Sequence, residues 1–201
     1  YILPNLPKFN RYFEPFVGGG SVFMAVHARE YYINDFSSEL VTLYKYIATS
    51  DKAFFRYVEL IDKSWINALK FFNKNKALID IYLHYRDEKI NKNELKSQIC
   101  QFCKDKENDI LNIIGKTFFS QTCILLKEME THLFRKMQRM RELEIKKHIL
   151  PNNDLLDNIE TAIKSAVYMN YRHLYNDAGI IKGDKALHCA LFFFIRNYAY
   201  S

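Results

Sequence analysis

The sequence predicts an α/β protein: a partial Rossmann-like core with a large helical insertion. Two observations lead to this prediction. The first fifty residues alternate short strand-like runs with a glycine turn and helical patterns, which is the order of the opening half of an α/β nucleotide-binding unit. The following hundred residues contain little strand signal and almost no Gly or Pro, which is typical of helices.

The N-terminal segment is predicted to hold two strands and two helices. Residues 11–16 form a short aromatic run that ends near a proline and meets a triple-glycine turn. A helix is expected after the glycines, because apolar residues then recur at helical spacing behind Ser21 as an N-cap. Those residues are Val22, Phe23, Val26 and Tyr31. Residues 31–35 are a second strand-like run, and another helix is expected to begin at Ser37.

The rest of the chain is predicted to be helical. The expected helices span residues 52–63, 76–86, 93–102, 121–144, a segment that starts after Pro151 and ends at Ala178 and Gly179, and residues 185–198. The last of these contains the run Leu-Phe-Phe-Phe-Ile and is expected to be buried nearly all round. The chain therefore divides into residues 1–50, an α/β segment, residues 51–153, a helical insertion, and residues 154–201, helices that return to the core.

Composition narrows the class of protein. The hydrophobic content is 49% and Gly and Pro are scarce, which excludes a disordered chain. The longest nearly unbroken apolar stretch, residues 187–195, is too short to span a bilayer, so no membrane partner is expected. Four cysteines do not make a disulfide framework in 201 residues, and they favour a reducing, cytoplasmic compartment. The net charge of +6 favours an anionic partner such as nucleic acid, although a basic surface that serves solubility alone remains an alternative.

Two carboxylates flank the triple-glycine turn. Glu14 lies at the end of the first strand-like run, and Asp35 ends the second, where doubly wound folds place an acid on ribose hydroxyls. The three glycines let a ligand approach the backbone closely. Glu14 argues against a phosphate, because like charges repel in a partly desolvated pocket. S-adenosylmethionine fits instead, since it carries an ammonium, a sulfonium and a ribose but no phosphate. The alternative is that each acid only caps a turn or helix.

A basic stretch lies toward the end of the helix expected over residues 121–144 and just beyond it. Its residues are Arg135, Lys136, Arg139, Arg141, Lys146 and Lys147. As a DNA contact, this stretch would bind phosphates without reading sequence. The alternative is a solvated helix face on which Glu142 and Glu144 pair with neighbouring cations.

The cysteines and histidines do not predict a metal or nucleophile site. Cys100 and Cys103 have metal-ligand spacing, but no second pair follows, and Cys123 and Cys189 stand alone. Two such thiols on one helix are usually small apolar groups in a core. The six histidines are scattered, and His188 is interpreted as a core or hinge residue.

The glycine turn and its surroundings resemble a known family. Residues 13–23 (FEPFVGGGSVF), 32–36 (YINDF) and 39–44 (ELVTLY) closely resemble the Dam-type (D12 class) adenine-specific DNA methyltransferases. Residues 187–201 (LHCALFFFIRNYAYS) resemble the segment that leads toward the target-recognition region in that family. The middle of the chain resembles members with an additional helical insert.

The resemblance implies transfer of a methyl group from S-adenosylmethionine to the exocyclic amine of adenine in double-stranded DNA, in a restriction–modification setting. The family extrudes its target base from the duplex. By this resemblance Asp35 binds the cofactor's ribose and Phe36 packs near its adenine ring. The methionine side of the cofactor is lined by Glu14, Pro15, Phe16, Gly18, Gly19 and Gly20. The helical insertion becomes a candidate DNA-contacting lobe, with Arg135, Lys136, Arg139 and Arg141 as its candidate DNA-binding residues.

Two departures from the family pattern qualify this expectation. The catalytic Asp-Pro-Pro-Tyr motif of the family does not occur in the sequence, and neither does its Trp-x-Gly-Gly-Lys-like cofactor segment. No catalytic residue is therefore assigned, and the chain is expected to be a fragment, a split gene product or one piece of a larger polypeptide that does not methylate DNA alone. A second polypeptide that supplies the motif is an expected partner. The alternatives are a non-catalytic DNA-binding or split subunit, and a dinucleotide-dependent oxidoreductase, against which Glu14 and the triple glycine count.

Overall fold

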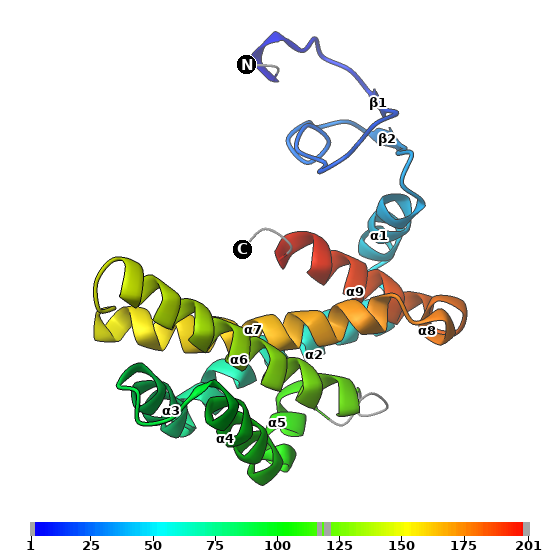
Figure 1. The fold of residues 1–201 in the computed structure, drawn as a ribbon. Helices are drawn as coiled ribbons and strands as arrows, with labels where there is room; N and C mark the ends of the chain where they lie inside the picture. Colours follow the sequence, from blue (N-terminus) through cyan, green and yellow to red (C-terminus); the bar gives the residue numbers. More distant parts are fainter. Residues whose placement is uncertain (1–2, 116–117, 119–121, 199–201) are drawn as a thin grey trace.

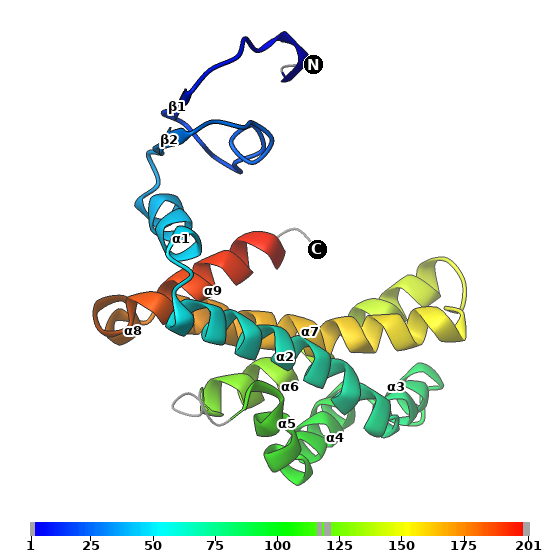
Figure 2. The ribbon, with the colours of Figure 1, turned by 180° about the vertical axis from the view of Figure 1, so that it is seen from behind.

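The computed structural model describes residues 3–115, 118 and 122–198, with Thr122 and Cys123 described by their backbone alone. A small N-terminal lobe, residues 3–37, stands off from a larger helical body, and helix α1 (Ser38–Ala48) lies between the two (Figure 1). Seen from behind, helix α2 continues directly from α1 into the body (Figure 2). Most of the described residues are helical.

The N-terminal lobe is built on a parallel pair of short strands. After a 3-10 turn at Leu3–Asn5, β1 (Arg11–Glu14) pairs with β2 (Glu30–Ile33), with Arg11 opposite Glu30 and Glu14 opposite Ile33. This order agrees with an α/β segment, but within the described residues the sheet is limited to this pair.

The two faces of this sheet differ. On one face, the Tyr31 hydroxyl donates to the Val26 carbonyl oxygen at 3.0 Å, and the Tyr31 ring meets Phe23 edge-on. On the other face, the rings of Phe13 and Tyr32 stack with their centroids 4.6 Å apart and remain 64% and 50% exposed. Only one face of the pair is therefore covered by described residues.

The helix expected directly after the glycines is not formed. Residues 21–25 make turns, in which the Ala25 N–H and the Val26 N–H both donate to the Val22 carbonyl oxygen. Tyr31, which was assigned to that helix, lies in β2 opposite Tyr12. Val26 and Tyr31 share an apolar cluster because the chain folds back through turns, and a helix extending to Tyr31 is incompatible with strand pairing there.

The helical body follows the sequence expectation in most places. Its helices are α2 (Lys52–Lys74), α3 (Ala77–Arg86), α4 (Lys92–Asp105), α5 (Glu107–Ile114), α6 (Thr122–Lys146), α7 (Asn152–Tyr175), α8 (Ala178–Gly183) and α9 (Lys185–Tyr198). The short α5 was not expected, and α2 runs well beyond residue 63. Gln121, the expected first residue of α6, lies outside the described residues, as do Tyr1 and residues 199–201 of the C-terminal family match.

Side-chain caps explain where several helices begin. The Ser37 hydroxyl accepts from the Leu40 N–H to start α1, and the Asp51 carboxylate accepts from the Phe54 N–H to start α2. Asn91 and Glu94 form a capping box at α4. Asp177 accepts from the Gly179 and Ile180 N–H groups. Ala178 and Gly179 therefore open α8 rather than end the preceding helix, which is a correction to the sequence prediction.

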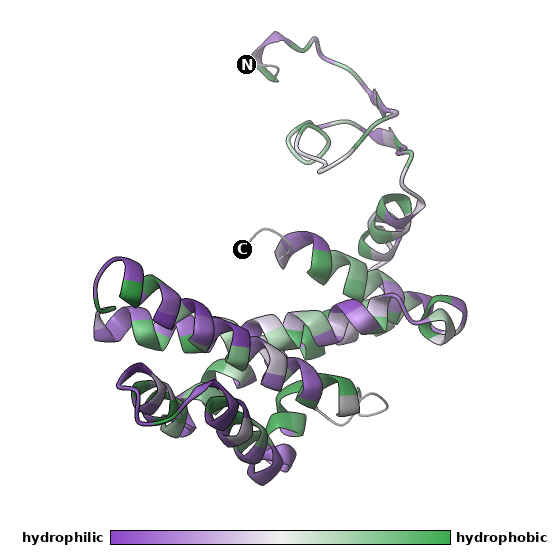
Figure 3. Ribbon diagram, in the orientation of Figure 1, coloured by the Kyte–Doolittle hydropathy of each residue, from purple (hydrophilic) through white to green (hydrophobic). Residues whose placement is uncertain are grey.

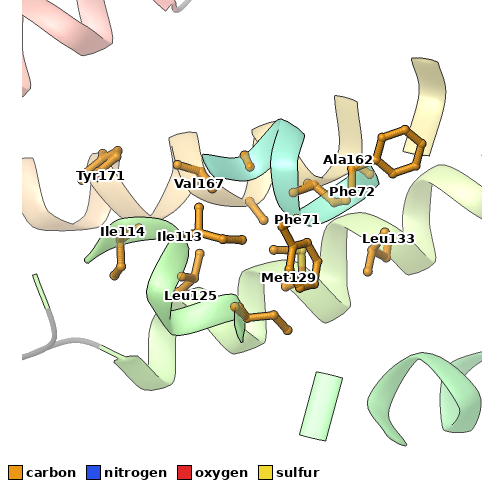
Figure 4. Close-up of a cluster of buried hydrophobic side chains, with 14 of the residues drawn as sticks. Phe71, Phe72, Ile113, Ile114, Leu125, Met129, Leu133, Ala162, Val167 and Tyr171 are labelled. Carbon is orange, nitrogen blue, oxygen red and sulfur yellow. The ribbon is translucent and has the colours of Figure 1, made fainter. Parts of the chain in front are cut away.

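One hydrophobic core joins the helices of the body. Helices α6 and α7 lie side by side, and α2 and α5 pack against them (Figures 1 and 2). The core residues drawn in Figure 4 include Phe71 and Phe72 of α2, Ile113 and Ile114 of α5, Leu125, Met129 and Leu133 of α6, and Ala162, Val167 and Tyr171 of α7. Hydrophilic residues cover much of α3, α4 and the end of the α6–α7 pair at which α6 ends and α7 begins (Figure 3). Burial of these apolar side chains is the main source of the body's stability.

Helix α9 is fixed to this body along one side only. Cys189, Ala190, Leu191 and Phe194 are buried, whereas Arg196 in its last turn is exposed. The expectation that α9 is buried nearly all round is therefore wrong. Its apolar run covers α2 and α7, and its last turn carries polar residues toward solvent.

We expect replacement of Asn170 by leucine to stabilise the helical body. Asn170 of α7 is fully buried, and neither its amide nitrogen nor its amide oxygen has a hydrogen-bond partner among the described residues. A buried polar group without a partner costs about 1–3 kcal/mol. Asn170→Leu should therefore raise the melting temperature in calorimetry by a few degrees, at about 2–4 °C per kcal/mol for a chain of this size. Asn112→Leu, at an exposed position of α5, is the matched control and should not. A lower melting temperature for Asn170→Leu would contradict this account.

Candidate functional site

The glycine turn folds back over the ends of the two strands. The Asn34 N–H donates to the Glu14 carbonyl oxygen, and the Val17 N–H donates to the Asn34 carbonyl oxygen, both at 2.9 Å. The Gly20 N–H then donates to the Val17 carbonyl oxygen at 2.7 Å. The turn is therefore fixed to the segment that follows β2, and the parallel pairing sets its position.

Asp35 ties the glycine turn to the start of α1. One carboxylate oxygen accepts the Gly18 N–H at 2.8 Å, and the other accepts the Ser37 N–H at 3.0 Å. These bonds, from Ser37 first and Gly18 second, hold the pKa of the Asp35 carboxyl below its usual range. Asp35 is thus an ionised group at the turn, and each of its oxygens retains a second lone pair for a further donor. The capping interpretation holds in part, since Asp35 bonds Ser37, although Ser37 itself caps the helix.

Glu14 has a different partner. The Tyr12 hydroxyl donates to the Glu14 carboxylate at 3.0 Å, on the same face of the sheet. Partial burial, followed by this hydrogen bond, raises the pKa of the Tyr12 phenol. The bond orients a half-buried carboxylate at the end of β1, next to the turn.

Tyr44 of α1 is hydrogen-bonded to the glycine turn. Its hydroxyl donates to the Gly18 carbonyl oxygen at 3.0 Å. Gly20 has a φ of +74°, and a Cβ added there would lie 2.6 Å from the Tyr44 hydroxyl oxygen. Glycine is therefore required at this position for its backbone conformation and for the close approach of Tyr44. Beneath the turn lies a cavity of about 150 Å³. It is lined by Val17, Ile33, Asn34, Val41, Tyr44, Lys45 and Ala48.

The structure brings some of the expected cofactor residues together and leaves others apart. Gly18 and Asp35 are in direct contact, and Gly19 and Gly20 follow in the same turn. Phe16 and Phe36 project outward, at 80% and 100% exposed, and Pro15 is exposed beside them. These rings offer open stacking surfaces and are not packed into the lobe.

Two residues at the turn were not assigned to the site from the sequence. Tyr44 was covered by the family match of residues 39–44 but received no role in the site. Arg196, at the far end of the chain, reaches the turn from α9, since its Nη2 atom lies 3.7 Å from the place of a Cβ on Gly19. No local pattern predicts this approach, because it depends on how α1 and α9 pack.

Comparison with known proteins identifies the family. A family model described as D12 class N6 adenine-specific DNA methyltransferase matches residues 1–170, which is most of the chain. The chain belongs to this family. The resemblance of the glycine turn to the D12 class is thereby confirmed.

A curated relative of this D12 chain is the Type II methyltransferase M1.LlaDCHI of Lactococcus lactis subsp. cremoris. The two are 44% identical over 45 residues, which are 22% of this chain and 15% of that relative. The matched part of the chain thus spans a small fraction of the relative's length. No solved structure matches the chain.

In this D12 chain the basic stretch lies on α6, apart from Lys147 just beyond its end, and is partly ion-paired. Arg135 and Arg139 are exposed, whereas Lys136 is half-buried. Arg139 contacts Glu142 at 3.3 Å, and Arg141 reaches Glu88, beyond the end of α3, at 2.9 Å. The exposed pair of Arg139 and Glu142 contributes little to stability, so Arg139 stays accessible to a stronger anion, as does the exposed Arg135.

Glu144 makes no salt bridge to a surface cation in the part of the chain that the structure describes, which corrects the sequence interpretation. It is buried and accepts hydrogen bonds from the Tyr82 hydroxyl at 2.7 Å and from the Leu150 N–H at 2.9 Å. Burial, followed by the bond to Glu144, raises the pKa of the Tyr82 phenol. This network fastens the end of α6 to α3 and to the loop before α7.

The described cysteines lie within helices. Cys103 and Cys189 are buried, and burial raises the pKa of each thiol to about 12. Among the residues described, no three His, Cys, Asp or Glu side chains are grouped as a metal site requires. In the same part of the chain, no helix has both the length and the apolar character needed to cross a bilayer.

We expect Gly20→Ala to loosen the glycine turn. The substitution places a side chain in a left-handed conformation and against the Tyr44 hydroxyl, at a cost of about 1–3 kcal/mol. Because the lobe is small, hydrogen exchange is the suitable measurement. The Val17 and Gly20 amides should lose protection, by about tenfold per 1.4 kcal/mol. Gly183→Ala in α8, where an added Cβ meets nothing within 4 Å, is the control. Unchanged protection in Gly20→Ala would show that the turn does not depend on this approach.

Proposed function

We propose that this chain is the cofactor-binding part of a site-specific DNA adenine N6-methyltransferase of a restriction–modification system, with S-adenosylmethionine as methyl donor. Membership of the D12 family supports the reaction class. The single structural observation that supports the cofactor is the ionised Asp35 carboxylate bonded across the glycine turn. This carboxylate can accept a hydrogen bond from a ribose hydroxyl, and it lies beside glycine residues whose backbone a ligand can approach closely.

The two carboxylates at the glycine turn fit a cationic nucleoside better than a phosphate. Glu14 and Asp35 both place negative charge near the turn, which repels a pyrophosphate. In this proposal Asp35 accepts from the ribose, Phe36 stacks near the adenine ring, and the methionine side lies against Glu14, Pro15, Phe16, Gly18, Gly19 and Gly20. Bound S-adenosylmethionine supplies the methyl group. The chain's own residues bind and orient it.

The proposed fold extends the observed strand pair. We propose that β1 and β2 are two strands of a Rossmann-like core, that residues 51–153 are an insertion with DNA-contacting residues, and that residues 154–201 return to the core. We assign no catalytic residue within the 201 residues, since the Asp-Pro-Pro-Tyr motif is absent from them. A second polypeptide or further chain that supplies the motif is a proposed partner, and the cytoplasm is the proposed compartment.

One alternative retains support. The missing Asp-Pro-Pro-Tyr motif favours a non-catalytic DNA-binding or split subunit of such an enzyme. The two are distinguished by whether methylation of adenine-containing duplex appears when a polypeptide carrying the motif is added. Family membership leaves the dinucleotide-dependent oxidoreductase without support.

We expect Asp35→Asn to weaken binding of S-adenosylmethionine by about 10- to 100-fold. The substitution removes a charged acceptor, and hydrogen bonds to charged groups contribute about 1.5–3 kcal/mol. Calorimetric titration of the two proteins measures the difference. Asp157→Asn, at an exposed position of α7, makes the same chemical change away from the turn and should bind like wild type. Equal affinity of Asp35→Asn and wild type would contradict the ribose role.

The same proposal predicts how affinity depends on pH. Because the folded-state pKa of Asp35 is lowered, its stabilising bonds persist below the unfolded pKa and are lost only as pH falls through the folded value. The affinity difference between wild type and Asp35→Asn should therefore stay constant from pH 7 to pH 5. A difference that shrinks over this range would indicate a carboxyl with a raised pKa, which would contradict the lowered pKa of Asp35.

We propose that Arg135, Lys136, Arg139 and Arg141 contact DNA phosphates, and we expect the double substitution Arg135→Gln/Lys136→Gln to weaken duplex binding. Each lost phosphate contact should reduce the slope of log K against log salt by about 0.9. Fluorescence anisotropy at several salt concentrations measures both quantities. Lys52→Gln/Arg56→Gln removes the same charge from exposed positions at the start of α2 and is the control. Equal slopes in the two double variants would assign the effect to net charge alone.

A further inference from the structure

Arg196 is held at the glycine turn by a helix that is itself fixed. The buried side of α9 packs on α1, α2 and α7, and Arg196 projects from its last turn on the exposed side. Its Nη2 atom lies 3.7 Å from the place that a Cβ on Gly19 would occupy. The guanidinium therefore lies within van der Waals range of the position that a side chain on Gly19 would begin to fill.

The backbone of Gly19 offers a second donor at the same place. The Gly18 N–H is bonded to Asp35, and the Gly20 N–H is bonded to the Val17 carbonyl oxygen. Among the described residues, the Gly19 N–H has no hydrogen-bond partner. A free N–H and a guanidinium thus meet at Gly19, and both are donors that favour an anion.

The described residues around Arg196 do not satisfy this cation. Its charge contributes to lowering the pKa of Asp35, but the Asp35 oxygens are bonded to backbone N–H groups. Among the described residues Arg196 makes no salt bridge. An exposed guanidinium beside a side-chain-free backbone is available to a ligand.

We propose that Arg196 and the Gly19 N–H form a subsite for a carboxylate, the one at the amino-acid end of the cofactor. This inference rests on the proposed function, because S-adenosylmethionine has a single anionic group, and that group is a carboxylate. A planar guanidinium matches carboxylate geometry. The arrangement separates the two charges of the amino-acid end: Glu14 lies near the ammonium, and Arg196 and Gly19 hold the carboxylate. The helical body thus contributes directly to cofactor binding through α9.

The test compares two ligands that differ only in the carboxylate. S-adenosylmethionine and its decarboxylated analogue are titrated calorimetrically into wild type, Arg196→Gln and Arg196→Lys. Wild type should bind S-adenosylmethionine about 10- to 100-fold more tightly than the analogue, and Arg196→Gln should bind the two nearly equally. Arg196→Lys should retain part of the preference, since it keeps the charge but loses the planar fork. Arg172→Gln, in the last turn of α7, is the matched control for loss of a cation at a helix end and should keep the wild-type preference.

The outcomes distinguish loss of the carboxylate subsite from loss of cofactor binding altogether. If wild type binds neither ligand, the cofactor proposal is overturned and the subsite falls with it. If wild type binds S-adenosylmethionine but Arg196→Gln weakens both ligands equally, Arg196 has a structural role and the subsite is overturned while the cofactor stands. If Arg196→Gln changes neither affinity but weakens duplex binding, Arg196 contacts a DNA phosphate and the carboxylate assignment is wrong.

Discussion

The N-terminal lobe depends on the Asp35 carboxylate, which bonds the glycine turn and the first residue before α1 at the same time. Without this bridge, the turn after β1 and the segment after β2 would be joined only by backbone bonds at the ends of two four-residue strands. A parallel pair this short has little stability of its own. The Asp35 carboxylate therefore orders the lobe and still has lone pairs that can accept hydrogen bonds from a ligand.

Helices α1 and α9 each place one residue against the glycine turn of the lobe. Tyr44 of α1 bonds the Gly18 carbonyl oxygen, and Arg196 of α9 approaches Gly19. Both helices are fixed by the large core below them, so the turn is positioned by apolar packing that begins many residues away. At the opposite end of the body, the buried bond between Tyr82 and Glu144 fixes the end of the basic helix α6 in a similar way. Rigid helices thus position both groups of residues assigned to ligands.

Local sequence patterns predicted those elements that depend on local interactions, such as helix caps and the glycine turn. Ser37 predicted the start of α1, and the triple glycine with its two acids located the turn. The helix expected after the glycines failed because Val26 and Tyr31 meet across a turn, and apolar spacing alone does not distinguish that contact from a helical face. The short α5 has few periods to reveal it. Tyr44 and Arg196 at the turn required tertiary packing, which one sequence does not encode in any short pattern.

The charged residues assigned to ligands divide between the lobe and the body. The lobe contributes Glu14 and Asp35, whereas the body contributes Arg196 and the exposed arginines of α6. A cofactor with an ammonium, a sulfonium and a carboxylate needs both signs within one site, while DNA needs cations over a longer surface. If all the cations were near Glu14 and Asp35, they would neutralise the acids and weaken the attraction for a sulfonium. In the proposed function, the two acids of the turn attract the cationic cofactor, while the exposed arginines of α6 lie on another part of the chain and remain available to DNA phosphates.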